Sequence, residues 1–235
     1  MRKLTALLLA LALTLGLSAA FADTKITVTG SGEVLIPADV AVISLGVNVR
    51  SAEAPSAQAE ANEVIAKIRE ALTAAGIDEE DISTGYINLY AAYDYSSSVE
   101  RITGYNASST LAVKVTDMSR VGEVIDLAFG AGANMLDGVS FSAKDDTAAR
   151  AEALKAAVAD AKAKADVLAE AAGLGKLEID SIAESGVYAY DSGTNNFSAK
   201  GMITEQAEDA ATVIRAAKIC VSASVTITYE AKEKK

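Results

Sequence analysis

Several residue types on which enzymes and metal sites rely are missing from this chain. It contains no histidine and no tryptophan, two prolines, and a single cysteine, Cys220. The absence of histidine excludes Ser-His and Cys-His catalytic pairs, and it also excludes imidazole ligands for zinc or copper. One cysteine cannot form an intrachain disulfide or a multi-cysteine metal site. Hydrolysis by carboxylates alone or by a Ser-Lys pair stays open, and we expect no cofactor, no bound metal and no catalytic residues.

The first 22 residues predict export. Arg2 and Lys3 precede a largely apolar run from Leu4 to Leu17, and small residues follow up to Ala22. This pattern is typical of a cleaved signal peptide, and the run is shorter than the roughly 20 apolar residues of a membrane span. We expect cleavage after Ala22, one mature domain over 23–235, a periplasmic or extracellular location, and no stable membrane insertion.

The chain is strongly acidic. Its net charge is −11, and removal of Arg2 and Lys3 with the signal peptide makes it −13. Such a chain repels nucleic acid and anionic membrane surfaces. We therefore expect neither as a partner.

Hydrophobic periodicity predicts an α+β fold. Strands with alternating apolar residues are expected over 38–49, 81–95, 101–115 and 135–144, and amphipathic helices over 51–75 and 119–129. Their order is strand-helix-strand-strand-helix-strand, which is a split βαβ core: an antiparallel sheet with helices on one face.

Beyond this core we expect a long alanine-rich helix over 146–172 and two further strands, over 177–184 and 218–230. Apolar residues recur along the helix at steps of three and four: Leu154, Val158, Ala161, Ala165, Leu168 and Ala172. Small residues allow close approach, so this stripe predicts a tightly packed partner, either a sheet or another subunit. Residues 187–218 are polar and weakly periodic, and they predict a mobile excursion.

A glycine-x-glycine pair, Gly30 and Gly32, follows a short strand expected over 25–30. A phosphate-binding loop would need these glycines to open a helix. Here the run Glu33 to Pro37 follows instead, and then another strand pattern. We expect a bulge or a sharp bend between two strand segments.

The same stretch carries a family resemblance. "VTGSGEVLIPADVAVISLGV", from Val28 to Val47, resembles the opening of the SIMPL-domain family, although Ala38 separates a proline and an acid that are usually adjacent there. Further blocks are similar to the family in the same order: "GIDEEDIST", "YAAYDY", "ITGYNASSTLAVKVTD", "GANMLDGVSFSAKD", "AVADAKAKADVLAEAAGL" and "VSASVTITYE". The likeness covers about 24–230, and the ordered set of blocks is more specific than any one of them.

The resemblance implies an exported bacterial protein, commonly periplasmic. Some family members are linked to oxidative-stress protection, some are antigens, and a ring-like or channel-like homo-oligomer is known in the family. The family has no established catalytic residues, so the resemblance assigns none to this chain.

Tyrosines gather along the predicted hairpin. They are Tyr86, Tyr90, Tyr93, Tyr95 and Tyr105. Tyrosine has an apolar body and a polar tip and suits interfaces, but it also packs well between paired strands. We interpret the five as a candidate interface for another subunit, an envelope protein or a glycan, together with Ala161 and Ala165 of the long helix.

Cys220 is a candidate redox residue. It alternates with the hydroxyl residues of the last strand, on the face opposite the apolar one. If that face is exposed, the thiol is open to oxidation or to pairing between subunits. The alternative is a small residue that is simply buried.

Acidic clusters occur at Asp78–Asp81 and at Asp145-Asp146. They lack the twelve-residue calcium loop, and helix capping explains them better, with Asp146 in the N-cap position. No pair of acids is singled out for hydrolysis. We therefore expect an exported, non-enzymatic envelope protein that self-assembles, binds another envelope component, or does both; the alternatives are a redox-responsive protector acting through Cys220 and a carboxylate-based or glycan-active hydrolase.

Overall fold

The structure is a computed structural model that describes residues 24–94, 96, 100–192 and 212–231. The chain divides into two compact units. The larger unit consists of residues 33–153 and 187–223, and the smaller unit consists of residues 1–32, 154–186 and 224–235.

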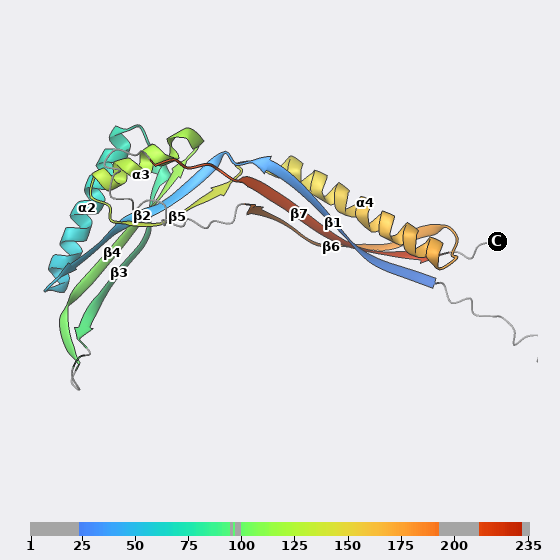
Figure 1. The fold of residues 1–235 in the computed structure, drawn as a ribbon, viewed down its shortest axis with the longest axis horizontal. Coiled ribbons are helices and arrows are strands. Elements are labelled where there is room, and N and C mark those ends of the chain that lie inside the picture. The colour runs from blue at the N-terminus through green and yellow to red at the C-terminus, as the bar shows by residue number, and fades with distance from the viewer. Residues whose placement is uncertain (1–23, 95, 97–99, 193–211, 232–235) are drawn as a thin grey trace, which may run out of the picture. The chain divides into compact units, whose positions relative to one another are not determined.

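The larger unit has the predicted split βαβ order. Its elements are β2 (Val40–Ser51), α2 (Ala54–Ala74), β3 (Ile82–Asp94), β4 (Arg101–Val115), α3 (Val121–Gly130) and β5 (Met135–Ser142), with short 3₁₀ turns at Glu79–Asp81 and Met118–Arg120. The strand order is β3-β4-β2-β5, and each neighbouring pair is antiparallel. The predicted α+β class, and the predicted order of the core, are confirmed (Figure 1).

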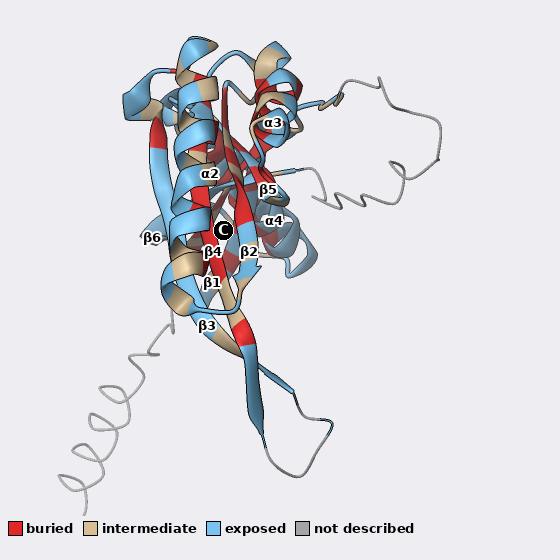
Figure 2. Cartoon of the chain, turned by 90° about the vertical axis from the view of Figure 1, so that its left-hand side faces the viewer, coloured by how far each residue is buried: buried red, intermediate tan, exposed pale blue. Residues whose placement is uncertain are grey.

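One face of this sheet is covered by helices α2 and α3. Ile43 pairs with Val113 and Leu45 with Leu111 in the central strands, and all four side chains are fully buried. Figure 2 shows the buried strands β2 and β4 behind α2, while β3 beside them is largely exposed. The alternation of β-strand side chains therefore gives the sheet a helix-covered face, to which these residues belong, and a helix-free face.

The second sheet contains β1 (Thr24–Pro37), β7 (Lys218–Ala231) and β6 (Leu177–Asp191), in the order β1-β7-β6. Helix α4 (Thr147–Ala171) covers one of its faces (Figure 1). Along β7 the odd-numbered residues are buried, and Ser222, Ser224, Thr226 and Thr228 are half-buried. The predicted alternation of the last strand is thus confirmed.

The stripe that α4 buries differs from the predicted one. It consists of alanines at every fourth position: Ala149, Ala153, Ala157, Ala161, Ala165 and Ala169. Val158 and Leu168, which we expected in the stripe, are 37% and 49% exposed. Only the smallest residues fit where the backbones of helix and sheet come this close, so alanine and not leucine occupies the contact.

Gly30 lies where helix and strand approach each other. A Cβ atom on Gly30 would lie 2.0 Å from the carbonyl oxygen of Ala157 and 2.7 Å from the Cβ of Ala161. Strand β1 runs without interruption from Thr24 to Pro37, so the expected separation into two strand segments at Gly30 and Gly32 is wrong, while the expected bulge stays a prediction. Gly30 is required for the close approach of a helix.

The excursion between β6 and β7 begins later than predicted. Strand β6 continues to Asp191, so residues 187–191 are part of a strand and not of a loop. Residues 193–211, which include most of the predicted excursion, lie outside the described residues.

Candidate interaction surface

Strand β3 is an outer strand with unusual exposure. Its twelve residues from Ile82 to Tyr93 include no charged side chain, and it lies at one end of the strand order. Ile82 is buried, Ala91 and Ala92 are partly exposed, and the other residues in this run are exposed. Proteins commonly protect such edges with lysine, proline, bulges or covering loops.

The opposite edge of the sheet shows that protection. Strand β5 has only eight residues, carries Asp137, and is out of register with β2 between Ser44 and Leu45. Short length, charge and an irregularity all oppose pairing with another chain. Strand β3 also has register shifts with its neighbour β4, but it offers a longer edge that is uncharged from Ile82 to Tyr93.

Apolar side chains lie on both faces of β3. Ile87 pairs with Ser109 and Leu89 with Ala107 on the helix-covered face, yet their side chains are 59% and 42% exposed. They extend past the area that α2 covers. An apolar edge that stays exposed on both faces is a candidate surface for contact with another chain.

Two of the predicted tyrosines share the helix-free face. Tyr90 pairs with Asn106, and Tyr86 lies near Thr110, whose Oγ1 accepts a hydrogen bond from the Tyr86 backbone N–H at 3.0 Å. We call Tyr86 and Tyr90 the tyrosine pair. Both side chains are exposed by more than two fifths, so the pair is open to a partner.

Tyr86 reaches across the sheet. Its hydroxyl donates to the sulfur of Met135 on β5 at 3.6 Å, although β4 and β2 lie between the two strands. Partial burial, with smaller effects from Asp137 and Tyr90, raises the pKa of Tyr86 above its ordinary value. The phenol is therefore neutral at physiological pH and presents a donor and an acceptor.

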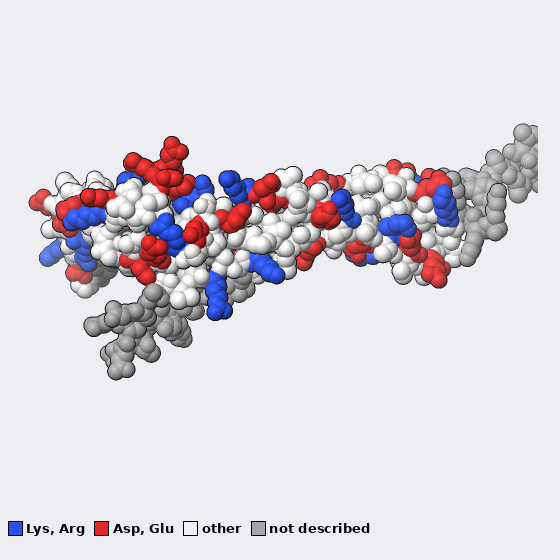
Figure 3. Space-filling model, turned by 90° about the horizontal axis from the view of Figure 1, so that it is seen from above, with Lys and Arg blue, Asp and Glu red and all other residues white. Residues whose placement is uncertain are grey.

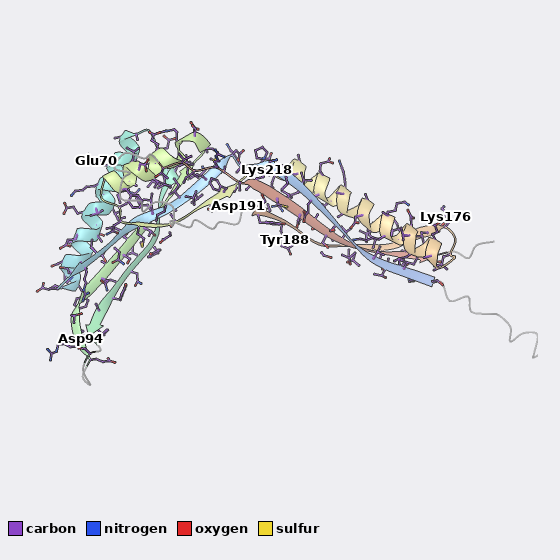
Figure 4. All side chains as sticks on the ribbon, in the orientation of Figure 1. Glu70, Asp94, Lys176, Tyr188, Asp191 and Lys218 are labelled. Carbon is purple, nitrogen blue, oxygen red and sulfur yellow. The ribbon has the colours of Figure 1, made fainter. Side chains whose placement is uncertain are left out.

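The other three tyrosines are not part of this pair. Tyr93, three residues after Tyr90 on the same strand, lies on the opposite face and pairs with Ile102. Tyr105 pairs with Ser51 on the helix-covered face and packs partly buried against the cluster of Val47, Ala57, Ala61 and Ala107. Its packing is explained within one chain. Tyr95 lies outside the described residues. Figure 4 places Asp94, the last residue of β3, at the far end of the strand.

Ala161 and Ala165 are fully buried in the smaller unit. The contact of Ala161 with Gly30 accounts for its burial. The sequence allows two possible partners for this helix, a sheet or another subunit. In the structure the helix packs against the sheet of its own chain. These two alanines are therefore not available to another subunit.

The outer edge of β1 is closed by two side chains of α4. The Nζ of Lys164 donates to the carbonyl oxygen of Thr29 at 3.0 Å, and Asp160 accepts from the backbone N–H of Ser31 at 2.8 Å. The two side chains also pair with each other at 2.7 Å. We call Asp160 and Lys164 the edge clamp, because they satisfy backbone groups that an added strand would need.

Cys220 is buried, although its neighbours Ser222 and Ser224 on the same face are half-buried. A hydrogen bond with the side chain of Cys220, and after it the electrostatic effect of that side chain, raises the pKa of Tyr190. The thiol is therefore covered by protein, with a phenol beside it. Buried cysteines are usually inert, and the redox role of Cys220 stays a prediction.

The acidic clusters form local hydrogen bonds and ion pairs. Asp145 accepts from the backbone N–H of Thr147 at the start of α4, while Asp146 pairs with Arg150 at 2.7 Å. Asp146 occupies the predicted N-cap position, because its carbonyl oxygen accepts from the Arg150 N–H at 2.9 Å, and the side chain of Asp145 binds the first N–H of the helix. Asp81 pairs with Lys114 at 2.9 Å. Over the described residues, no group of three acids or cysteines comes together in a way that could hold a metal ion.

A hollow of about 730 Å³ lies beside α3 in the larger unit, lined by Ala71, Ser119, Glu123, Asp126, Leu127, Gly130, Ala131 and Thr212. Its two acids are already engaged. Asp126 accepts from the backbone N–H and the hydroxyl of Thr212 at 3.0 and 2.5 Å, and Glu123 pairs with Arg120 at 3.1 Å. Gly122 leaves room for the carbonyl of Thr212. The hydrogen bonds between Asp126 and Thr212 therefore hold the chain that leads into β7 beside α3.

Charges of both signs are interspersed over the face of each unit that Figure 3 shows. Within the described part of the chain, no helix has the length and apolar character needed to cross a bilayer.

Comparison with known proteins gives one family. Residues 26–229 match the model of the family described as SIMPL, protein of unknown function (DUF541). The resemblance read from the ordered sequence blocks is confirmed.

Individual relatives match over part of their length. The chain is 32% identical over 142 residues to the 26 kDa periplasmic immunogenic protein of Brucella melitensis, and the aligned part covers 58% of this chain and 57% of that protein. It is 29% identical over 136 residues to the uncharacterized protein YggE of Escherichia coli K12, with 58% and 55% covered. The match thus spans a little over half the length of these relatives.

Proposed function

Because the chain belongs to the SIMPL family (DUF541), and because a relative carries the name of a periplasmic protein, we propose that it is an exported, non-catalytic protein that assembles with further copies of itself. The observation that carries the proposal is strand β3, a long outer strand that is uncharged from Ile82 to Tyr93 and has exposed apolar side chains on both faces.

Self-pairing of β3 agrees with the charge of the chain. A chain of net charge −11 repels its own copies, so copies meet most favourably where charge is absent. Two β3 strands in antiparallel register would form a two-fold, self-complementary contact and complete each other's backbone hydrogen bonds. The exposed side chains Ile87 and Leu89 would be covered on one face, and Tyr86 and Tyr90 on the other.

A non-catalytic role is supported by how the acids are used. Asp126, Asp146 and Asp160 each bind a neighbouring group of the chain itself. A carboxylate pair that hydrolyses a glycosidic bond must instead have its two carboxyl groups about 5 to 9 Å apart, facing a substrate. Export is supported by the signal-peptide pattern over residues 1–22.

The test is the solution mass of the purified protein by light scattering after size exclusion. We expect an oligomer for the natural sequence and a monomer for Ile87→Lys, because the buried lysine charges would face one another across the paired strands. Val167→Lys on α4 is the matched control: its side chain is 66% exposed, against 59% for Ile87. That variant should keep the oligomer.

Far-UV circular dichroism establishes that both variants are folded. A monomeric natural protein would contradict self-assembly. An oligomer that both variants retain would contradict the role of β3.

A further inference from the structure

The second sheet has one closed edge and one open edge. At the closed edge, the edge clamp of Asp160 and Lys164 satisfies backbone groups of β1. At the other end of the strand order lies β6, and each of its residues from Glu178 to Ser185 is exposed. The exposed residues include Ile179 and Ile182, at 58% and 54%.

Open edges accept extended segments of other chains, with backbone hydrogen bonds giving affinity and alternate side chains giving specificity. Strand β6 therefore offers a template for strand addition. Figure 4 shows where this edge begins, at Lys176 in the turn that joins α4 to β6.

The charge of β6 distinguishes it from β3. Within the part of β6 that belongs to the smaller unit, Glu178, Asp180 and Glu184 are acidic and no residue is basic. A second copy of β6 would place these carboxylates opposite one another, and directly opposed like charges destabilise paired strands. Self-pairing is thus opposed at this edge, whereas at β3 no charge opposes it.

Ion pairs within the chain show that basic side chains fit beside the acids of β6. The Nζ of Lys25 on β1 lies 2.8 Å from Oδ2 of Asp180, although β7 separates the two strands. At the start of the strand, Lys176 lies 3.8 Å from Glu178. Lysine side chains therefore approach two of the three carboxylates from within the chain, and Glu184 lies further along the exposed edge.

From these observations we infer that the edge of β6 binds an extended segment of a different protein, in which lysine or arginine alternates with apolar residues. The basic side chains would lie near Glu178 and Glu184 on one face, and the apolar ones would cover Ile179 on the other. Complementary charge would also speed the encounter and make binding weaken with added salt.

The test uses a fluorescein-labelled peptide of alternating lysine and valine and measures its anisotropy with the purified protein. We expect saturable binding that weakens with salt. The double substitution Glu178→Lys with Glu184→Lys should weaken binding about fivefold or more, since each exposed charge contact contributes up to ~1 kcal/mol and its reversal adds repulsion. Both side chains are exposed, so the variant should fold.

Two controls separate strand addition from general electrostatic attraction. Glu60→Lys with Glu79→Lys makes the same charge change at exposed positions of the larger unit and should leave binding unchanged. A peptide with the same side chains but N-methylated backbone amides should not bind, because it cannot form the strand hydrogen bonds.

Three results would overturn the inference. The N-methylated peptide could bind as well as the parent, the control substitutions could weaken binding as much as those in β6, or a peptide of alternating glutamate and valine could bind equally. The inference would also be overturned if the peptide bound only to the Ile87→Lys variant and not to the natural protein. The edge of β6 would then be covered by another copy of the chain in the self-assembled protein.

Discussion

Lys164 and Thr29 are joined by a hydrogen bond from a helix side chain to the outer edge of a strand, with the Nζ of Lys164 3.0 Å from the carbonyl oxygen of Thr29. Beside it, Asp160 holds the neighbouring N–H of Ser31. A helix placed over a sheet thus also blocks the edge of that sheet. This arrangement makes the two sheets differ in where another chain can bind.

Removal of the edge clamp should expose the edge of β1. We expect Lys164→Met to lower the free energy of unfolding and to increase association, because the carbonyl of Thr29 becomes available to another strand. Urea unfolding and light scattering measure the two effects. Lys162→Met is the control, because Lys162 pairs with Asp166 four residues along the same helix. Equal effects of the two substitutions would show that the ion pair on the helix, and not the strand edge, is responsible.

The clamp should also depend on pH. The Lys164 ammonium, followed by the Ser31 N–H, lowers the pKa of Asp160 below its ordinary value. A carboxyl with a depressed pKa stabilises the folded state above its unfolded pKa of about 4, and this contribution is lost as the pH falls through the folded pKa. Asp160→Asn should therefore unfold more easily than the natural protein at pH 7. The difference should shrink as the pH drops below about 4, and a difference that stays constant would contradict the assignment.

Gly30 should not tolerate a side chain. In Gly30→Ala the new methyl group would meet the backbone of α4 at Ala157 and Ala161, and overpacking of this kind typically costs about 1–3 kcal/mol. Denaturant unfolding measures the loss. Gly130→Ala, at a helical position with nothing within 4 Å of the added atom, should be neutral or stabilising by up to ~1 kcal/mol. Equal stability of Gly30→Ala and the natural protein would contradict the close approach of α4.

Cys220 should react slowly in the folded protein. Its thiol is buried, so we expect a thiol reagent to modify it at least about tenfold more slowly than in the unfolded chain. Cys220→Ser supplies the baseline without a thiol. Rapid modification of the native protein would revive the redox hypothesis, and cells that carry Cys220→Ser and keep full peroxide resistance would contradict it.

Much of the fold could be predicted from local patterns. The run from Val40 to Ser142 alternates strand and helix periods clearly, and its strand order follows from the split βαβ connectivity. The stripe on α4 was harder to assign, because alanine and leucine both recur at helical spacing there. Only the distance to Gly30 shows that the alanines make the contact.

The interaction surface was only partly predictable. The tyrosines were visible in the sequence, but a strand period cannot say that Tyr105 lies on the helix-covered face and Tyr90 on the other. The two register shifts between β3 and β4 decide those faces. Likewise, the sequence of β6 contains acids and isoleucines but does not reveal that the strand is an edge.

The sequence by itself determined the chemistry that this protein lacks, the order of its elements and its family, because these depend on residue types and on neighbours along the chain. The tertiary structure alone decided which strand edges are closed and which are open. An edge depends on which segments pair through space: Lys164 closes β1 from 135 residues away in the sequence, while β3 and β6 each have a neighbour on one side only among the strands that the structure describes.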